Sequence, residues 1–117
     1  MSVCTTDAVE QSVQHVLVNV DAAGNISCVP SELNVVGTDV LITFLLSGAN
    51  WGFPDSGAVV VSNGGSQFPI PCWTVNNKQA ALLDCNSVQG TFSYTVTVQN
   101  ASTGQERHMD PTIKNED

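Results

Sequence analysis

Positive charge is scarce in this chain of 117 residues, which holds three Lys and Arg residues against eleven Asp and Glu and has a net charge of −8. Charged residues make up 12% of the sequence, roughly half the share of an ordinary globular domain. Binding to nucleic acid or to an anionic membrane requires clustered Lys and Arg, so the sequence predicts neither a nucleic-acid partner nor a membrane partner.

Targeting and membrane-spanning segments are also missing. No apolar run approaches the length of a transmembrane helix. Residues 1–8 lack the positive start and the apolar block of a secretory signal. The compartment therefore stays open: cytoplasmic if Met1 is the native start, and secreted or periplasmic if Met1 was appended to a mature chain.

Sequence signatures of catalysis and of zinc binding are absent. The chain contains no G-x-S-x-G and no C-x-x-C, and neither His15 nor His108 has a nearby Ser and acid in the pattern of a catalytic triad. The Asp residues fall at turns, where hydrogen bonding to the local backbone explains them. The sequence thus predicts no enzyme, no cofactor and no metal site of its own.

Alternation of apolar and polar residues is the strongest pattern present. The segment 91–98, TFSYTVTV, alternates strictly and predicts a strand with one buried and one solvated face. The segment 40–46, VLITFLL, is the most apolar run in the chain and predicts a central strand that is buried on both faces. In the segment 12–20, SVQHVLVNV, Leu17 interrupts the alternation of the valines, which indicates coverage of both faces there as well.

Short strands separated by turn residues account for the rest of the chain. Further strands are predicted at 26–29, 33–36 and 58–62, with a helical turn or a short strand at 80–83 and a last edge strand at 110–113. Residues 67–73 are predicted to be extended, but their two prolines bar them from a central position in a sheet. Seven or eight such strands without amphipathic helices predict an all-β fold, an antiparallel two-sheet sandwich. Residues 1–117 are predicted to form a single β-sandwich domain, with residues 1–11 and 114–117 frayed.

One combination of segments resembles a known group of proteins. A Tyr94–Val98 strand is followed by a Gly-containing turn and by the terminal segment Asp110–Ile113, DPTI. This combination resembles small uncharacterised bacterial proteins with a cupredoxin-like or immunoglobulin-like β-sandwich. The resemblance is confined to the C-terminal part of the chain. It implies the fold, and no activity comes with it.

Four cysteines allow three pairings if all are oxidised: they are Cys4, Cys28, Cys72 and Cys85. Cys72 and Cys85 flank an Asn-Asn turn signal, which favours a disulfide between them across a hairpin or a long loop. Such a bond contributes roughly 3 kcal/mol in the chain-entropy model. Cys4 and Cys28 pair only if the N-terminal segment folds back. The alternative is four reduced thiols, the usual state in a reducing cytosol.

Aromatic residues in loops carry the ligand-binding hypothesis. Trp51, Phe53 and Trp73 lie in segments rich in Gly and Pro, where flat apolar rings can stack on a sugar ring or on a side chain of a partner protein. The alternative is that both Trp residues cap the core of the sandwich. The predicted function is a non-catalytic binding module for a protein or carbohydrate ligand, as a monomer or weak homodimer.

Two other functions stay open at this point. A cupredoxin-like metal-handling protein would use His15, His108, Met109 and a cysteine as ligands, the donor types of a blue-copper site. A structural subunit would associate through an exposed strand edge. The poorly capped last strand and the polar tail after Ala101 support this third possibility.

Overall fold

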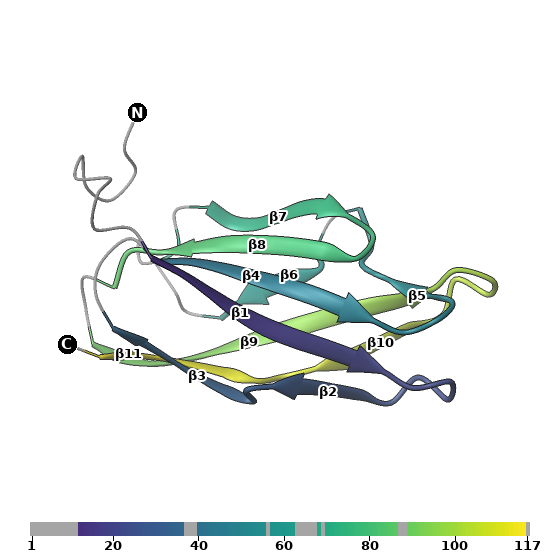
Figure 1. The fold of residues 1–117 in the computed structure, drawn as a ribbon, viewed down its shortest axis with the longest axis horizontal. Helices are drawn as coiled ribbons and strands as arrows, with labels where there is room; N and C mark the ends of the chain where they lie inside the picture. The colour runs from purple at the N-terminus through teal and green to yellow at the C-terminus, as the bar shows by residue number, and fades with distance from the viewer. Residues whose placement is uncertain are drawn as a thin grey trace.

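The computed structural model describes residues 12–36, 40–55, 57–62, 68, 70–86 and 89–116, with the backbone alone for residues 12 and 70–73. These residues form two β-sheets that pack face to face, and no helix occurs among them (Figure 1). The predicted all-β sandwich is confirmed. No segment of the described chain is therefore a helix that is long and apolar enough to cross a membrane.

The first sheet has the strand order β2-β1-β4-β8-β7. Its strands are β1 (Ser12–Val20), β2 (Ile26–Val29), β4 (Val40–Ser47), β7 (Ile70–Asn76) and β8 (Gln79–Asp84). The β7–β8 hairpin turns at Asn77 and Lys78, where the Asn76 side chain accepts a hydrogen bond from the Lys78 amide (2.8 Å). The Asn-Asn turn signal therefore indicated this hairpin correctly.

The second sheet is built around the long strand β9, with β10 and β11 along one side and β5 and β6 along the other. Strand β3 extends this sheet beyond β11. Its strands are β3 (Glu32–Val36), β5 (Trp51–Gly52), β6 (Val59–Val61), β9 (Gly90–Asn100), β10 (Glu106–Met109) and β11 (Thr112–Glu116). The strands predicted at 33–36, 58–62 and 91–98 lie within two residues of these bounds.

The prediction of a purely antiparallel sandwich is wrong, because both sheets are mixed. Strands β1 and β4 pair in parallel along their whole length, and so do β3 and β11. Between β1 and β4 the chain passes through β2 and then through β3 in the other sheet. It therefore returns beside β1 in the same direction, as parallel pairing requires of a crossover. The described strands number eleven rather than seven or eight.

The C-terminal strand also corrects the sequence-based expectations. Residues 114–116 were expected to be frayed, yet they belong to β11 and are paired with β3. Strand β11 is not an edge strand, because β9 lies on its other side. Residues 80–83 are strand rather than helical turn. Residues 1–11 and 117, for which fraying was also predicted, lie outside the described residues.

The core fills the space between the sheets. Tyr94, Val96 and Val98 of β9 are fully buried, which confirms the inward face predicted from TFSYTVTV. The Tyr94 ring packs against the Phe44 ring of β4, with 5.5 Å between the ring centroids. Val16 and Val18 of β1 are equally buried in the same cluster. These contacts join the central strands of the two sheets.

Among the cysteines, Cys28 is a buried free thiol on β2. Burial raises the pKa of this thiol to about 11, so little thiolate forms at neutral pH. Cys72 lies on β7, with its side chain outside the described set, and Cys85 follows the end of β8. The predicted bond between Cys72 and Cys85 stays a prediction.

Substitution of Phe44 tests the join between the two sheets. Phe44→Ala leaves a cavity between fully buried neighbours and is expected to lower the free energy of unfolding by about 3–5 kcal/mol. Leu45→Ala is the matched control, because Leu45 follows on the same strand but is 37% exposed. Urea unfolding of both variants measures the two effects. Equal losses would show that β4 does not bury the Phe44 face in preference to the Leu45 face.

Candidate functional site

Two of the three aromatic residues predicted to form a ligand-binding surface, Trp51 and Phe53, are buried. Trp51 and Phe53 are each 4% exposed and belong to the core cluster. The Gly24 turn covers Trp51, since a Cβ atom built on Gly24 would lie 2.9 Å from Cζ2 of the indole. The expectation that these rings are presented to a ligand is therefore wrong for Trp51 and Phe53, which cap the core. The side chain of Trp73 lies outside the described residues.

A small pocket of about 290 Å³ does open beside Trp51 and Phe53. Lys78 contributes to its lining, and its ammonium group donates hydrogen bonds to the carbonyl oxygens of Gly48 (2.8 Å) and Trp51. Because this ammonium group already serves two backbone carbonyls, it anchors the β7–β8 turn to the loop that holds Trp51. The pocket is therefore the space between the β7–β8 turn and the loop that holds Trp51.

The predicted metal ligands lie far apart. His15 is on β1 with its side chain on the outer face of the first sheet, where Nδ1 lies 2.5 Å from Oγ1 of Thr43. His108 is on β10 of the other sheet, and its Nδ1 lies 2.9 Å from Oγ1 of Thr97. The two outer faces are separated by the full thickness of the sandwich, since stacked sheets lie about 10 Å apart. Within the described residues, no three His, Cys, Asp or Glu side chains converge as metal ligands would.

A buried carboxyl group lies at one end of the sandwich. Asp84 is fully buried at the end of β8. It accepts hydrogen bonds from the backbone N–H of Asn86 (2.9 Å) and from the side-chain amide of Asn115 (3.2 Å). Its Oδ2 atom has no hydrogen-bond partner among the described residues. Desolvation by burial raises the pKa of this carboxyl, against the lowering effect of the two hydrogen bonds. The Asn86 side chain donates to the carbonyl oxygens of Val35 and Glu116.

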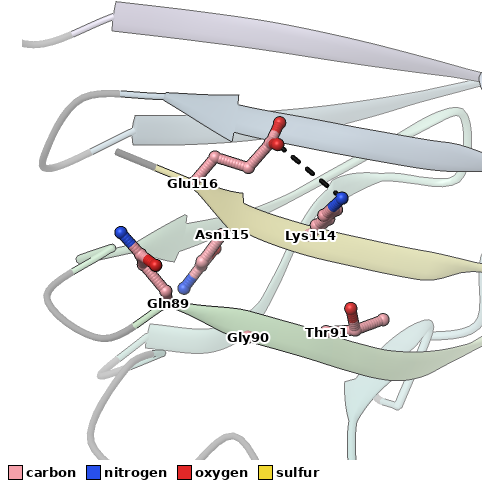
Figure 2. A pocket seen from close by; sticks show the side chains of 6 residues that line it. All are labelled: Gln89, Gly90, Thr91, Lys114, Asn115 and Glu116. Carbon is pink, nitrogen blue, oxygen red and sulfur yellow. Dashed lines mark ion pairs between the residues drawn. The ribbon is translucent and has the colours of Figure 1, made fainter.

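This polar cluster ties the two sheets together at their ends, because β8 belongs to one sheet and the Val35, Asn115 and Glu116 strands belong to the other. An open depression of about 460 Å³ lies beside it. Figure 2 shows its side chains on the start of β9 and the end of β11, with an ion pair between Lys114 and Glu116 (3.7 Å). Asp84 does not line this depression. The buried acid therefore serves as a connection between the sheets.

The outer face of the first sheet is the remaining candidate. It is formed by the residues of β1, β2 and β4 that alternate with the core residues, and we call it the outer face. Towards β8 this side of the sheet is covered, because Thr43, Ala81 and Leu83 are buried. Leu17 occupies its middle, with Val29 of β2 on one side and Leu45 of β4 on the other. These three side chains are 46%, 54% and 37% exposed. Val13, 53% exposed, extends the apolar surface along β1.

Charge is absent from this face. The described strands β1, β2, β4 and β7 contain no Asp, Glu, Lys or Arg, and in β8 the one such residue is Asp84, which is buried. The acidic residues of the described chain lie instead in turns, in loops and on the second sheet. They are Asp21, Glu32, Asp55, Glu106, Asp110 and Glu116. An exposed apolar surface without charge is typical of a protein contact surface.

Sequence reasoning missed the outer face as a site, although its signal was visible. Leu17 within SVQHVLVNV and the mostly apolar run VLITFLL both predicted strands covered on two sides. The structure covers one side of β1 and β4 with the second sheet, and it leaves Leu17 and Leu45 of the other side exposed. The interruption of the alternation thus marks an exposed apolar surface.

Comparison with known proteins adds no functional assignment. No protein-family model matches the chain, and no curated protein matches it.

Titration of Asp84 has a measurable consequence for stability. Because its pKa is raised in the folded state, folding favours the protonated form, and this stabilisation is lost as the pH rises through the folded-state pKa. We expect Asp84→Asn to gain stability relative to the wild type as the pH rises from about 4 to about 7. Urea unfolding of both proteins across this range measures the difference.

Asp21→Asn is the control with the opposite sign. Hydrogen bonds from Asn25 lower the pKa of Asp21, so its contribution is present above the unfolded pKa and is lost as the pH falls. The wild type should exceed Asp21→Asn in stability at neutral pH, and the two should converge in acid. A pH-independent difference between wild type and Asp84→Asn would contradict the raised pKa of Asp84.

Proposed function

We propose that this chain is a non-catalytic interaction module and that the outer face is its contact surface for a protein. The observation that carries the proposal is the coincidence of exposed aliphatic side chains with a lack of charge on one sheet. The chain has a net charge of −8, yet the described strands of this sheet expose no acidic side chain.

A protein partner fits this surface better than a carbohydrate. Sugar rings are bound by exposed aromatic faces together with convergent polar groups, and Trp51 and Phe53 are buried. The outer face instead offers Leu and Val side chains bordered by uncharged polar residues such as Asn19 and Gln79. Protein interfaces show this composition, with an apolar centre that is depleted of charge and a polar rim.

The two other functions lose the features that suggested them. Metal handling rested on His15 and His108, which lie on opposite outer faces. Association through the last strand rested on an edge position, but β11 is enclosed by β9 and β3. Among the remaining edges, β7 is interrupted by two register shifts, which is how proteins protect an edge strand from pairing. The cupredoxin-like or immunoglobulin-like type of the sandwich stays a prediction.

We also propose that Cys85, a buried residue directly after β8, forms a disulfide. Cys28 is a free thiol, which leaves Cys72 or Cys4 as the partner. The β7–β8 register places Cys72 near Ala81 and Leu82, so regular strand spacing separates it from Cys85 by about 10 Å. A disulfide spans Cα atoms about 4.4–6.8 Å apart, so the predicted pair requires the register shifts of β7 to bring them closer. Peptide mapping after alkylation without reductant identifies the partner.

Site-specific photocrosslinking tests the proposed contact surface. We expect Leu17→p-benzoylphenylalanine to form protein adducts in the native host, because position 17 lies at the centre of the outer face. Val60→p-benzoylphenylalanine is the matched control, since Val60 is 51% exposed on β6 of the other sheet. The adducts are detected on denaturing gels and identified by mass spectrometry. Equal yields from the two positions, or no adduct from either, would rule out the outer face as the contact surface.

A further inference from the structure

We infer that the disulfide proposed for Cys85 is formed with Cys4 and fastens the N-terminal segment to the end of the sandwich where β8 stops. The inference rests on that disulfide and is independent of the contact surface proposed on the outer face. The strand register fixes how far Cys28 and Cys72 lie from Cys85, and it leaves Cys4 within reach.

Cys28 lies at the wrong end of the first sheet to bond with Cys85. Among the cysteines whose side chains the structure describes, Cys28 is the free thiol. It is opposite Val18 of β1, and Val18 is opposite Leu46 of β4. Leu46 lies about 20 Å along β4 from Val40, which is level with the end of β8. A disulfide spans Cα atoms about 4.4–6.8 Å apart, so Cys28 is out of reach.

Cys72 lies on the neighbouring strand β7, level with the segment 81–83 of β8. Its backbone is described, so the register shift between Ile70 and Trp73 is already included in this level. Regular strand spacing separates the Cα atoms of Cys72 and Cys85 by about 10 Å, which exceeds the span of a disulfide. The register thus disfavours this pair.

The start of β1 lies at the same end of the first sheet as Cys85 (Figure 1). Ser12 is opposite Val40 of β4, and Val40 is opposite Asp84 of β8. Two strand spacings therefore separate Ser12 from Asp84, a distance of about 10 Å. Cys4 precedes Ser12 by eight residues, which span up to about 26 Å when extended. The length of chain thus allows Cys4 to reach Cys85 without any change in the described strands.

Formation of the bond is an oxidation in which the two thiols together lose two protons and two electrons. The oxidant is a second disulfide, carried by a small molecule or by an oxidoreductase. One cysteine thiolate attacks it, releases one thiol and leaves a mixed disulfide; the other thiolate then attacks the cysteine sulfur and releases the second thiol. Because such bonds persist in oxidising compartments, the inference favours the secreted or periplasmic alternative for this chain.

The bond closes a loop that contains all five strands of the first sheet. A loop of this length removes much conformational freedom from the unfolded chain. The bond also lies next to Asp84, whose contacts with Asn86 and Asn115 join the ends of the two sheets. A covalent and a polar connection therefore stabilise the same end of the sandwich.

Peptide mapping with two proteases identifies the partner of Cys85. The full chain is equilibrated with reduced and oxidised glutathione, denatured, and alkylated without reductant. Trypsin alone does not distinguish the pairs, because residues 1–78 hold both Cys4 and Cys72. Additional cleavage after Glu separates all four cysteines, since it cuts at Glu10, Glu32 and Glu106. We expect residues 1–10 to be linked to residues 79–106.

The other outcomes of the mapping separate the two proposals about Cys85. A link between residues 79–106 and any other peptide would overturn Cys4 as the partner and keep the disulfide. Alkylation of Cys85 after equilibration would overturn the disulfide itself. Neither outcome bears on the outer face, which photocrosslinking at position 17 tests separately.

Thermal unfolding of two serine variants gives an independent readout. Cys4→Ser should lower the Tm of the oxidised protein by about 10 °C, and added reductant should lower the Tm of this variant no further. Cys72→Ser is the matched control and should stay within about 2 °C of the oxidised wild type. A loss of Tm in Cys72→Ser with none in Cys4→Ser would contradict the inferred pair.

Discussion

Strand β4 imposes the constraint on which this architecture depends, because it is apolar on both faces. Its inward side chains, including Phe44, are buried against the second sheet through contact with Tyr94. One partner sheet covers one face of a strand. On the other face Thr43 is buried, whereas Leu45, which lies beside Leu17 of β1, stays exposed. The same mostly apolar run thus builds the core and leaves an exposed leucine on the opposite face.

The positions of the charged side chains agree with this division between the two faces of the first sheet. Among the described residues, no charged side chain lies on the exposed face of the first sheet, and the exposed acidic residues lie in turns, in loops and on the second sheet. The buried Asp84 is the exception within the first sheet, and it belongs to the polar cluster with Asn86 and Asn115 that joins the ends of the two sheets. The acidic side chains and the exposed aliphatic side chains of the first sheet thus lie on different surfaces of one small sandwich.

Much of this fold was predictable from the sequence, because strand periodicity is a local signal. The alternation in TFSYTVTV identified the buried face of β9, and the Asn-Asn signal identified the β7–β8 hairpin. The parallel pairing of β1 with β4 was not predictable, since it depends on the chain crossing to the other sheet. Strand β10 was also missed, because the four residues ERHM show no alternation of apolar and polar side chains.

The site was predictable only in part. Trp51 suggested a platform because it lies in a Gly-rich loop, but the close approach of Gly24 that buries it is a tertiary contact. Leu17 carried the better signal. Methyl NMR with a soluble paramagnetic relaxation agent tests the outer face most directly. Strong broadening of the Leu17 and Leu45 methyl signals is predicted, with little effect on the buried Val16 and Val18. Equal protection of all four residues would contradict an exposed outer face.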